Sequence, residues 1–179
     1  GTMRKIIYYV AVSLDGFIAG PNDDISGFTA QGNGVDQYFA DLKAFDTVIM
    51  GRNTYEFGYK YGLIPGQPAY PHMDHYIFSN HLQFEKQHRK VKIRKPDLEE
   101  IIRLKESNGT DIYLCGGGQF AGWLLDHQQI DLLKIKLNPF IQGEGVPLFG
   151  KSCKNYKARL LDSAPYEHGM QIMTYEILY

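Results

Sequence analysis

Three consecutive glycines constrain this chain more than any other feature of its sequence. They occupy residues 116–118, after the apolar segment 112–115 and before apolar residues at helical spacing: Phe120, Trp123 and Leu124. This pattern predicts a buried strand, a tight turn and the start of a helix. Glycine has no Cβ, so a ligand can lie against bare backbone, and free N–H groups at a helix start attract phosphate. A turn without a ligand is the alternative, but three glycines here favour phosphate binding, although the spacing matches neither a Rossmann motif nor a P-loop.

Length and composition indicate one domain, residues 1–179, in which Gly1 and Thr2 ahead of Met3 look like a cloning remnant. The net charge of −1 offers no basic excess for nucleic acid or for an anionic membrane. No apolar run approaches the ~20 residues that span a bilayer, and no signal peptide is recognisable. Two isolated cysteines fit a reducing compartment, so we expect a cytoplasmic protein that binds neither nucleic acid nor membrane.

Strand and helix patterns alternate along most of the chain. Apolar runs at 6–12, 47–50, 76–79 and 91–93 predict strands, as does the segment before the glycines. Amphipathic helices are predicted at 35–45, at 96–108 and after the glycines. A further short helix is predicted after residues 51–52, with Asn53 or Thr54 as its cap. In the strand at 132–137, Leu133, Ile135 and Leu137 alternate with Leu132, Lys134 and Lys136, which predicts one wetter face. Segments 159–161 and 170–178 predict a closing antiparallel pair. The order gives a three-layer α/β/α domain with a mostly parallel sheet and an antiparallel C-terminal edge.

Two irregular stretches stand out. The polar, glycine-containing segment from Leu14 to Gly34 is long for a loop in a compact domain, and such loops are usually functional or disordered. His72-Met-Asp-His75 has residue types that bind metals, but it lies in a proline-rich segment without a clear third ligand. We therefore expect a solvated loop there and no metal site.

Three segments in order carry a family resemblance: Tyr9-Val-Ala-Val-Ser-Leu-Asp-Gly-Phe-Ile-Ala19, Val48-Ile-Met-Gly-Arg-Asn-Thr-Tyr-Glu56 and Ile112-Tyr-Leu-Cys-Gly-Gly-Gly-Gln-Phe120. Together they resemble dihydrofolate reductases. The Ser-Leu-Asp-Gly sequence, with Ile141-Gln-Gly-Glu-Gly-Val-Pro-Leu-Phe149, is more similar to the reductase domain of riboflavin biosynthesis and its stand-alone bacterial relatives. The resemblance extends from about Lys5 to Phe149 and implies the dihydrofolate reductase-like fold.

The resemblance also implies a site for a pyridine dinucleotide at the ends of successive strands. Carried over position by position, its residues are Ala11 and Ile18 for the nicotinamide; Gly51, Arg52, Asn53 and Thr54 for the pyrophosphate and adenosine side; Ser79 and Asn80 for the ribose; and Gly116, Gly117 and Gly118, flanked by Cys115, Gln119 and Phe120, for the pyrophosphate. Gln119 stands where dihydrofolate reductases often have an arginine for the 2′-phosphate. NADPH is the expected cofactor, and NADH stays open.

Dihydrofolate reduction needs a carboxylate at the start of the first helix to hold the pterin. Counting back from residues 50–51 places that position at Val35, with Asp36 adjacent, and one residue on a helix is a rotation of ~100°. Asp36 is therefore either a catalytic candidate or a charge favoured by the helix dipole. Asp15 is the second catalytic candidate, or a turn residue. The expected walls of the substrate side are Phe17, Tyr38 and Phe39.

The leading hypothesis is an NAD(P)H-dependent reductase of a small pyrimidine-like or pterin-like heterocycle, resembling 5-amino-6-(5-phosphoribosylamino)uracil reductase. The segment from Leu14 to Gly34 would close over the nicotinamide. A nucleotide-binding module without catalysis is the alternative, and dihydrofolate reductase itself ranks third because of the Val35/Asp36 register. The resemblance, together with the apolar, aromatic C-terminal strand, also implies a homodimer.

Overall fold

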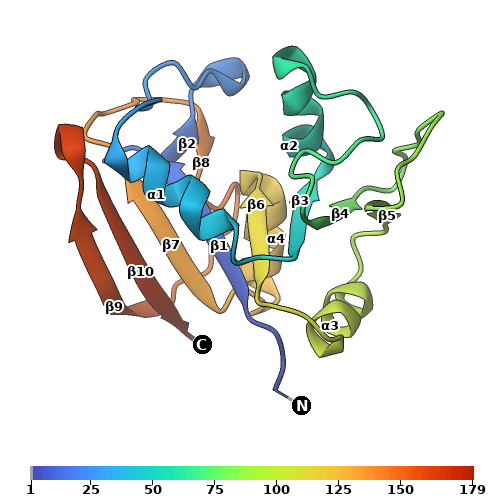
Figure 1. The fold of residues 1–179 in the computed structure, drawn as a ribbon. Coiled ribbons are helices and arrows are strands. Elements are labelled where there is room, and N and C mark those ends of the chain that lie inside the picture. Colours follow the sequence, from blue (N-terminus) through green and yellow to red (C-terminus); the bar gives the residue numbers. More distant parts are fainter. Residues whose placement is uncertain (1) are drawn as a thin grey trace.

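A computed structural model describes residues 2–179, and the chain is built around one eight-stranded sheet (Figure 1). The strands are β1 (Ile6–Val12), β3 (Thr47–Gly51), β4 (Asp74–Phe78), β5 (Val91–Arg94), β6 (Ile112–Gly116), β7 (Leu132–Leu137), β9 (Lys157–Pro165) and β10 (Gln171–Leu178). Their order in the sheet is β5-β4-β3-β6-β1-β7-β10-β9. Pairing is parallel from β5 to β7, whereas β10 is antiparallel to both β7 and β9. The mostly parallel sheet with an antiparallel C-terminal edge is thus confirmed.

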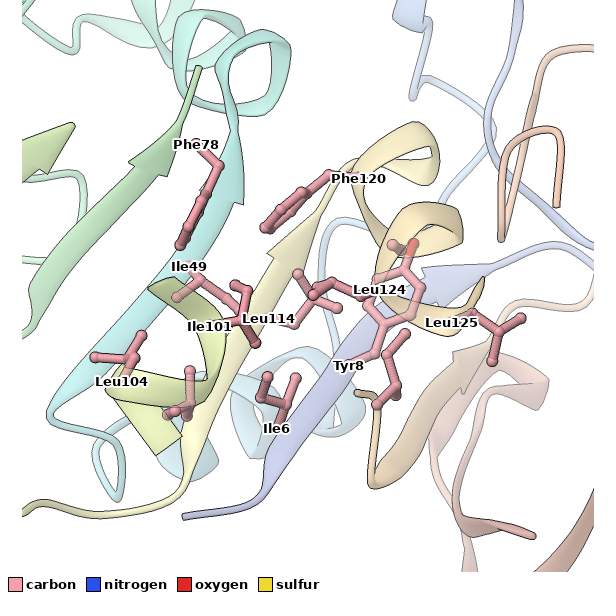
Figure 2. Close-up of a cluster of buried hydrophobic side chains, with 13 residues drawn as sticks. Ile6, Tyr8, Ile49, Phe78, Ile101, Leu104, Leu114, Phe120, Leu124 and Leu125 are labelled. Carbon is pink, nitrogen blue, oxygen red and sulfur yellow. The ribbon is translucent and has the colours of Figure 1, made fainter. Parts of the chain in front are cut away.

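Helices cover both faces of the sheet and complete three layers. They are α1 (Asn33–Leu42), α2 (Arg52–Phe57), α3 (Leu98–Glu106) and α4 (Gly118–Asp126). One core cluster joins α3 and α4 to the sheet, with Ile101 and Leu124 packed near Ile49 and Leu114 (Figure 2). A second cluster joins α1 and α2 to the opposite face. The three-layer dihydrofolate reductase-like architecture predicted from the sequence is confirmed.

Strand β1 is apolar along its whole length because both of its faces are covered. Tyr8 packs in the α3–α4 cluster, whereas its neighbour Tyr9 packs in the α1–α2 cluster. Successive side chains of a strand point to opposite faces, so adjacent tyrosines enter different cores. This central position makes β1 the strand from which both sides of the sheet can be reached.

The prediction of a wetter face on β7 is wrong, since all six of its residues are half-buried. Its two lysines lie on the α1 side, and each is covered by an aromatic ring. Lys134 Nζ lies 4.8 Å from the ring centroid of Tyr9, and Lys136 Nζ lies 3.5 Å from that of Tyr38. A lysine can bury its stem under an aromatic face while keeping its charge, which alternation of residue types alone does not reveal.

The segment between β1 and α1 contains structure that the sequence analysis missed. Strand β2 (Phe17–Ala19) pairs antiparallel with β8 (Val146–Pro147) in a separate two-stranded sheet, and the short 3₁₀ helix η1 (Pro21–Asp23) follows β2. Two further 3₁₀ turns are η2 (Gly58–Tyr61) and η3 (Glu167–Gly169). The β2–β8 pair joins the segment after β1 to the loop after β7, above the carboxyl end of the sheet (Figure 1).

Helix boundaries differ from the predictions in α1, α2 and α3, the last of which spans Leu98–Glu106 rather than 96–108. Helix α1 begins at Asn33 and ends at Leu42, rather than spanning 35–45. Helix α2 begins at Arg52, directly after β3, with Gly51 in the capping position and no side-chain cap. The prediction that Asn53 or Thr54 caps it is therefore wrong, because both residues already lie inside the helix. Their side chains remain available for the cleft that α2 borders.

The segment His72-Met-Asp-His75 is not the solvated loop that was predicted. His75 belongs to β4 and is completely buried. Its Nδ1 lies 2.9 Å from the carbonyl of Met73, and its Nε2 accepts a hydrogen bond from the backbone N–H of Tyr70 at 3.0 Å. Within residues 2–179, no helix is both long and apolar enough to cross a membrane.

Candidate active site

A cleft of about 680 Å³ lies at the carboxyl edge of the sheet, in the size range of small-molecule sites. It is bordered by the turns that follow β3 and β6, which are neighbours in the sheet. Ten of the fourteen predicted cofactor residues line it: Ile18, Gly51, Arg52, Asn53, Thr54, Cys115, Gly117, Gly118, Gln119 and Phe120. Side-by-side parallel strands bring their carboxyl ends together, and ligands bind at such ends.

Each of the three glycines at 116–118 is required for a different structural reason. Gly116 has φ +131°, which residues with side chains rarely adopt. A β-carbon on Gly117 would lie 3.0 Å from Thr54 Oγ1, so this position keeps the start of α4 close to α2. A β-carbon on Gly118 would lie 2.4 Å from the carbonyl oxygen of Pro147, which allows no room at all. Gly118 is therefore required by the packing of α4 against β8, although its backbone also lines the cleft, whereas the positions of Gly116 and Gly117 face the Thr54 hydroxyl.

The start of α4 supplies anion-binding groups. No side chain within the described residues caps this helix, so the N–H groups of its first turn remain free for a ligand. Arg52 lines the same cleft and is the sole basic residue among those that line it in the described chain. Its Nε contacts Glu56 Oε1 at 3.1 Å in a half-exposed pair, which contributes little energy and leaves the guanidinium accessible. The cleft thus combines helix N–H groups with one guanidinium, a combination suited to phosphate.

One wall of the cleft is a row of stacked aromatic rings. Phe78 and Phe120 have centroids 5.0 Å apart and planes inclined by 21° (Figure 2). Phe120 and Trp123 continue the row at 6.0 Å and 13°. All three residues line the cleft. Because the rings stack on one another, they present mainly their edges to the cleft, and this apolar lining beside phosphate-binding groups suits a nucleotide base.

The segment after β1 closes the opposite side of the cleft, and Asp15 anchors it. The Asp15 carboxylate accepts hydrogen bonds from Ser13 Oγ (2.6 Å), Gln142 N (3.0 Å) and Gly143 N (2.8 Å). The bond from Ser13, followed by those from Gln142 and Gly143, lowers the pKa of Asp15 to about 2. The structure therefore gives Asp15 a clear role in holding two loops together.

On the α1 side, a group of tyrosines continues inward from Cys115. The hydroxyls of Tyr38 and Tyr113 are hydrogen-bonded to each other, and Tyr70 Oη lies 3.7 Å from Cys115 Sγ. Burial raises the pKa of Cys115 and of Tyr38, so both stay protonated at neutral pH. Cys115 is thus a residue shared between the cleft and the tyrosine group.

Nine predicted residues do not line this cleft. Asp36 is exposed on α1, whereas the adjacent Val35 is half-buried. Phe39 is 57% exposed and packs edge-on against Tyr38, while the Ser79 hydroxyl accepts from the backbone N–H of Leu82. The nine residues are Ala11, Asp15, Phe17, Asp36, Tyr38, Phe39, Ser79, Asn80 and Gly116.

Sequence reasoning missed nine residues that line the cleft: Val10, Ala19, Asp23, Ile25, Phe57, Phe78, Pro96, Trp123 and Val146. Phe78 and Trp123 were assigned to the correct elements, but their stacking through Phe120 depends on the sheet order. Val146 reaches the cleft through the β2–β8 pair. The short apolar run Phe17–Ala19 was the available signal for that pair, and three residues are too few to make it distinctive.

Comparison with known proteins places these features in a family context. The profile of the RibD C-terminal domain family matches residues 4–172. The uncharacterized protein YwjB of Bacillus subtilis (strain 168) is 30% identical over 172 residues, covering 94% of this chain and 96% of YwjB.

Two solved structures show the same fold. A diaminohydroxyphosphoribosylaminopyrimidine deaminase/5-amino-6-(5-phosphoribosylamino)uracil reductase from Thermotoga maritima superposes with a TM-score of 0.72 at 16% identity, over 98% of this chain and 57% of that longer one. Dihydrofolate reductase from Enterococcus faecalis, complexed with NADP(H), superposes with a TM-score of 0.67 at 17% identity, over 98% of this chain and 97% of the reductase.

Proposed function

The chain belongs to the RibD C-terminal domain family, and from this premise we propose that it is an NAD(P)H-dependent reductase of a small pyrimidine-like or pterin-like heterocycle. The observation that carries the proposal is the cleft in which the turns at Gly51–Arg52 and Gly117–Gly118 lie side by side. When bound, the reduced nicotinamide supplies the hydride. The uracil reductase from Thermotoga maritima and the NADP(H)-bound dihydrofolate reductase support this reaction class.

Different residues of the cleft would bind the pyrophosphate, the adenine and the nicotinamide of the dinucleotide. The first turn of α4 and the Arg52 guanidinium would hold the pyrophosphate, and Thr54 would add a hydroxyl donor. The Phe78–Phe120–Trp123 wall would take the adenine ring. Ile18, Cys115 and the Ala11 backbone would border the nicotinamide. The β2 segment would exclude water above it.

The proposed preference is for NADPH, with NADH as a weaker cofactor. Arg52 is the one cation in the lining of the described chain, so its field favours the extra negative charge of NADPH, but Gln119 adds no charge and Asp23 contributes an acid. A single guanidinium gives a modest preference, since a charge-assisted contact at a half-exposed site is worth about tenfold in affinity or less. On the substrate side, Phe17, Tyr38 and Phe39 are the proposed walls. Asp36 stays the proposed proton-handling group, whereas Asp15, with its pKa of about 2, stays a candidate only as an ionised carboxylate.

The test is a titration with NADPH, NADH and ATP, followed by the fluorescence of Trp123. Trp123 is the single tryptophan of the chain and lines the cleft, so it reports a bound dinucleotide directly. We expect NADPH to bind most tightly. Substrate screening then measures the oxidation of NADPH in the presence of 5-amino-6-(5-phosphoribosylamino)uracil and of dihydrofolate.

Two arginine variants test whether Arg52 contributes to the NADPH affinity measured in the titration. Arg52→Met should weaken NADPH binding by up to about tenfold, because one charge-assisted phosphate contact at a half-exposed site is lost. Arg159→Met is the matched control, since Arg159 is exposed on β9 and pairs with Glu176 far from the cleft lining. Dinucleotide binding without hydride transfer to any heterocycle would favour a nucleotide-binding module. No dinucleotide binding by fluorescence or calorimetry would end the reductase proposal.

We also propose a homodimer formed through the C-terminal edge of the sheet. Strand β9 is the edge strand, and Leu160 and Leu161 are half-exposed on it. Tyr179 is likewise 45% exposed at the end of the chain. An edge strand with exposed apolar residues is a surface that proteins usually cover. Light scattering that gives a monomer mass would contradict the dimer.

A further inference from the structure

Lys136 is a cationic residue on the substrate side to which the proposed function assigns no role. It lies on β7 in direct register with Ala11 of β1, the residue proposed to border the nicotinamide. Its Nζ lies 3.5 Å from the ring centroid of Tyr38, on the α1 side of the sheet. Lys136 therefore stands between the proposed nicotinamide position and a proposed wall of the substrate site.

The charge of Lys136 has no acidic counterpart, in contrast to that of its neighbour. Lys134, two residues earlier on the same face, pairs with Asp41 at 3.3 Å. Within residues 2–179, no carboxylate lies within 4.0 Å of Lys136 Nζ, and no oxygen accepts a hydrogen bond from it. The other ionisable groups around it are those of Tyr38 on α1 and of Cys115 and Tyr113 on β6, which stay protonated because burial raises their pKa.

The ammonium group is not completely sealed in the core. Every fully buried side-chain nitrogen or oxygen in the described chain has a hydrogen-bond partner, whereas Lys136 Nζ has none, so this atom keeps some exposure to solvent. Burial of the remainder of the side chain lowers the pKa of Lys136 to about 8, and the residue is therefore mostly charged at neutral pH. An ammonium group that contacts one aromatic face and has no hydrogen-bond acceptor keeps N–H donors for an external acceptor.

We propose that Lys136 determines the substrate class, by binding an anionic or carbonyl oxygen carried on the heterocycle next to the nicotinamide position. This inference rests on the proposed reductase function, whose substrate side it specifies. A dihydrofolate reductase instead holds its pterin through a carboxylate, whereas here the carboxylate of Asp36 is exposed on α1 and the partly buried cation of Lys136 lies against Tyr38. A site with an unpaired cation selects against a positively charged ring, because the two like charges repel.

The test compares two probes that differ by one charge, orotate and uracil. Orotate is a uracil that carries a carboxylate. Calorimetry at neutral pH with saturating NADPH should show orotate binding about tenfold or more tighter than uracil. Lys136→Met should remove this difference, and Lys136→Arg should retain most of it. Lys134→Met is the matched control on the same face of β7, and it should leave the difference unchanged because Lys134 is already paired with Asp41.

The outcomes separate this inference from the proposed function. Equal binding of orotate and uracil by the wild type, or the same orotate preference in Lys136→Met, overturns the role of Lys136 even if NADPH binds normally. Failure of NADPH to bind the wild type ends the reductase proposal, whereas a Lys136-dependent orotate preference measured without NADPH would still support an anion-selecting site. If Lys136→Met does not fold, as judged by circular dichroism, Lys136→Gln replaces it in the same comparison.

Discussion

The hydroxyl of Thr54 faces the backbone of Gly117 so closely that a β-carbon on that glycine would lie 3.0 Å from Thr54 Oγ1. Two helices that are far apart in the sequence, α2 and α4, therefore begin at one place. Each contributes groups that alone would be ordinary: a hydroxyl and a guanidinium from one, and uncapped N–H groups from the other. Their juxtaposition creates the anion-binding character of the cleft.

Thr54→Val should weaken NADPH binding by about tenfold, because a hydrogen bond to a charged group is lost while the shape of the side chain is kept. The measurement is the Trp123 fluorescence titration. Thr174→Val on β10 is the control, since Thr174 lies away from the cleft lining. Equal NADPH affinity of Thr54→Val and wild type would show that the hydroxyl does not contact the cofactor.

Gly118→Ala should lower the free energy of unfolding by roughly 1–3 kcal/mol, because the new β-carbon would meet the backbone carbonyl of Pro147 at 2.4 Å. Gly58→Ala is the comparison: Gly58 has helical φ and ψ, and its β-carbon would meet only the flexible side chain of Leu63. Denaturant unfolding should separate the two variants. A Gly118→Ala protein as stable as wild type would mean that β8 moves away easily.

Stability should decrease as the pH falls from about 6.5 to about 4, because His75 must be neutral in the folded protein. Burial lowers the pKa of His75 from 6.5 to about 4, so protonation favours the unfolded chain within that interval. The loss attributable to His75 is at most about 3 kcal/mol. Unfolding by denaturant across this pH range measures it. His75→Gln should be less stable at neutral pH but should lose much of the pH dependence; an unchanged slope would assign the effect to other groups.

Asp36→Asn tests the proposed proton-handling role of Asp36. If this carboxyl group transfers a proton, turnover should fall by about 100-fold or more while NADPH affinity stays the same. Glu56→Gln serves as a control for the loss of a carboxylate near the cofactor side. Unchanged turnover in Asp36→Asn would remove Asp36 from the chemistry, in keeping with its exposed position on α1.

Local patterns were sufficient for much of this fold. Residues 6–12 coincide with β1 because a strand covered on both faces needs a continuous apolar run. The glycines marked the junction of β6 and α4 because Gly116 has a positive φ and Gly118 has no room for a side chain. Ten residues transferred from the family resemblance also line the cleft.

The remainder depends on contacts that no local pattern encodes. The β2–β8 pair joins two segments that are far apart in the sequence. Each segment is too short to have a strand signature of its own. His75 was assigned to solvent because prolines surround it, whereas its burial follows from the place of β4 beside β3. The significance of Lys136 required two facts beyond the sequence: its register with Ala11 and its distance from the nearest carboxylates.

Strand β1 contributes Val10 to the cofactor cleft and the next residue, Ala11, to the opposite face beside Lys136. The groups proposed to hold the phosphates and the adenine therefore lie on one face of the sheet, those proposed to recognise the heterocycle lie on the other, and the two reacting rings would meet at the carboxyl end of β1. Substitutions on α1 and β7 should change which heterocycle the protein binds while the binding of the dinucleotide is kept. For enzyme engineering, this means that libraries confined to those two elements should yield new substrate preferences without having to rebuild dinucleotide affinity each time.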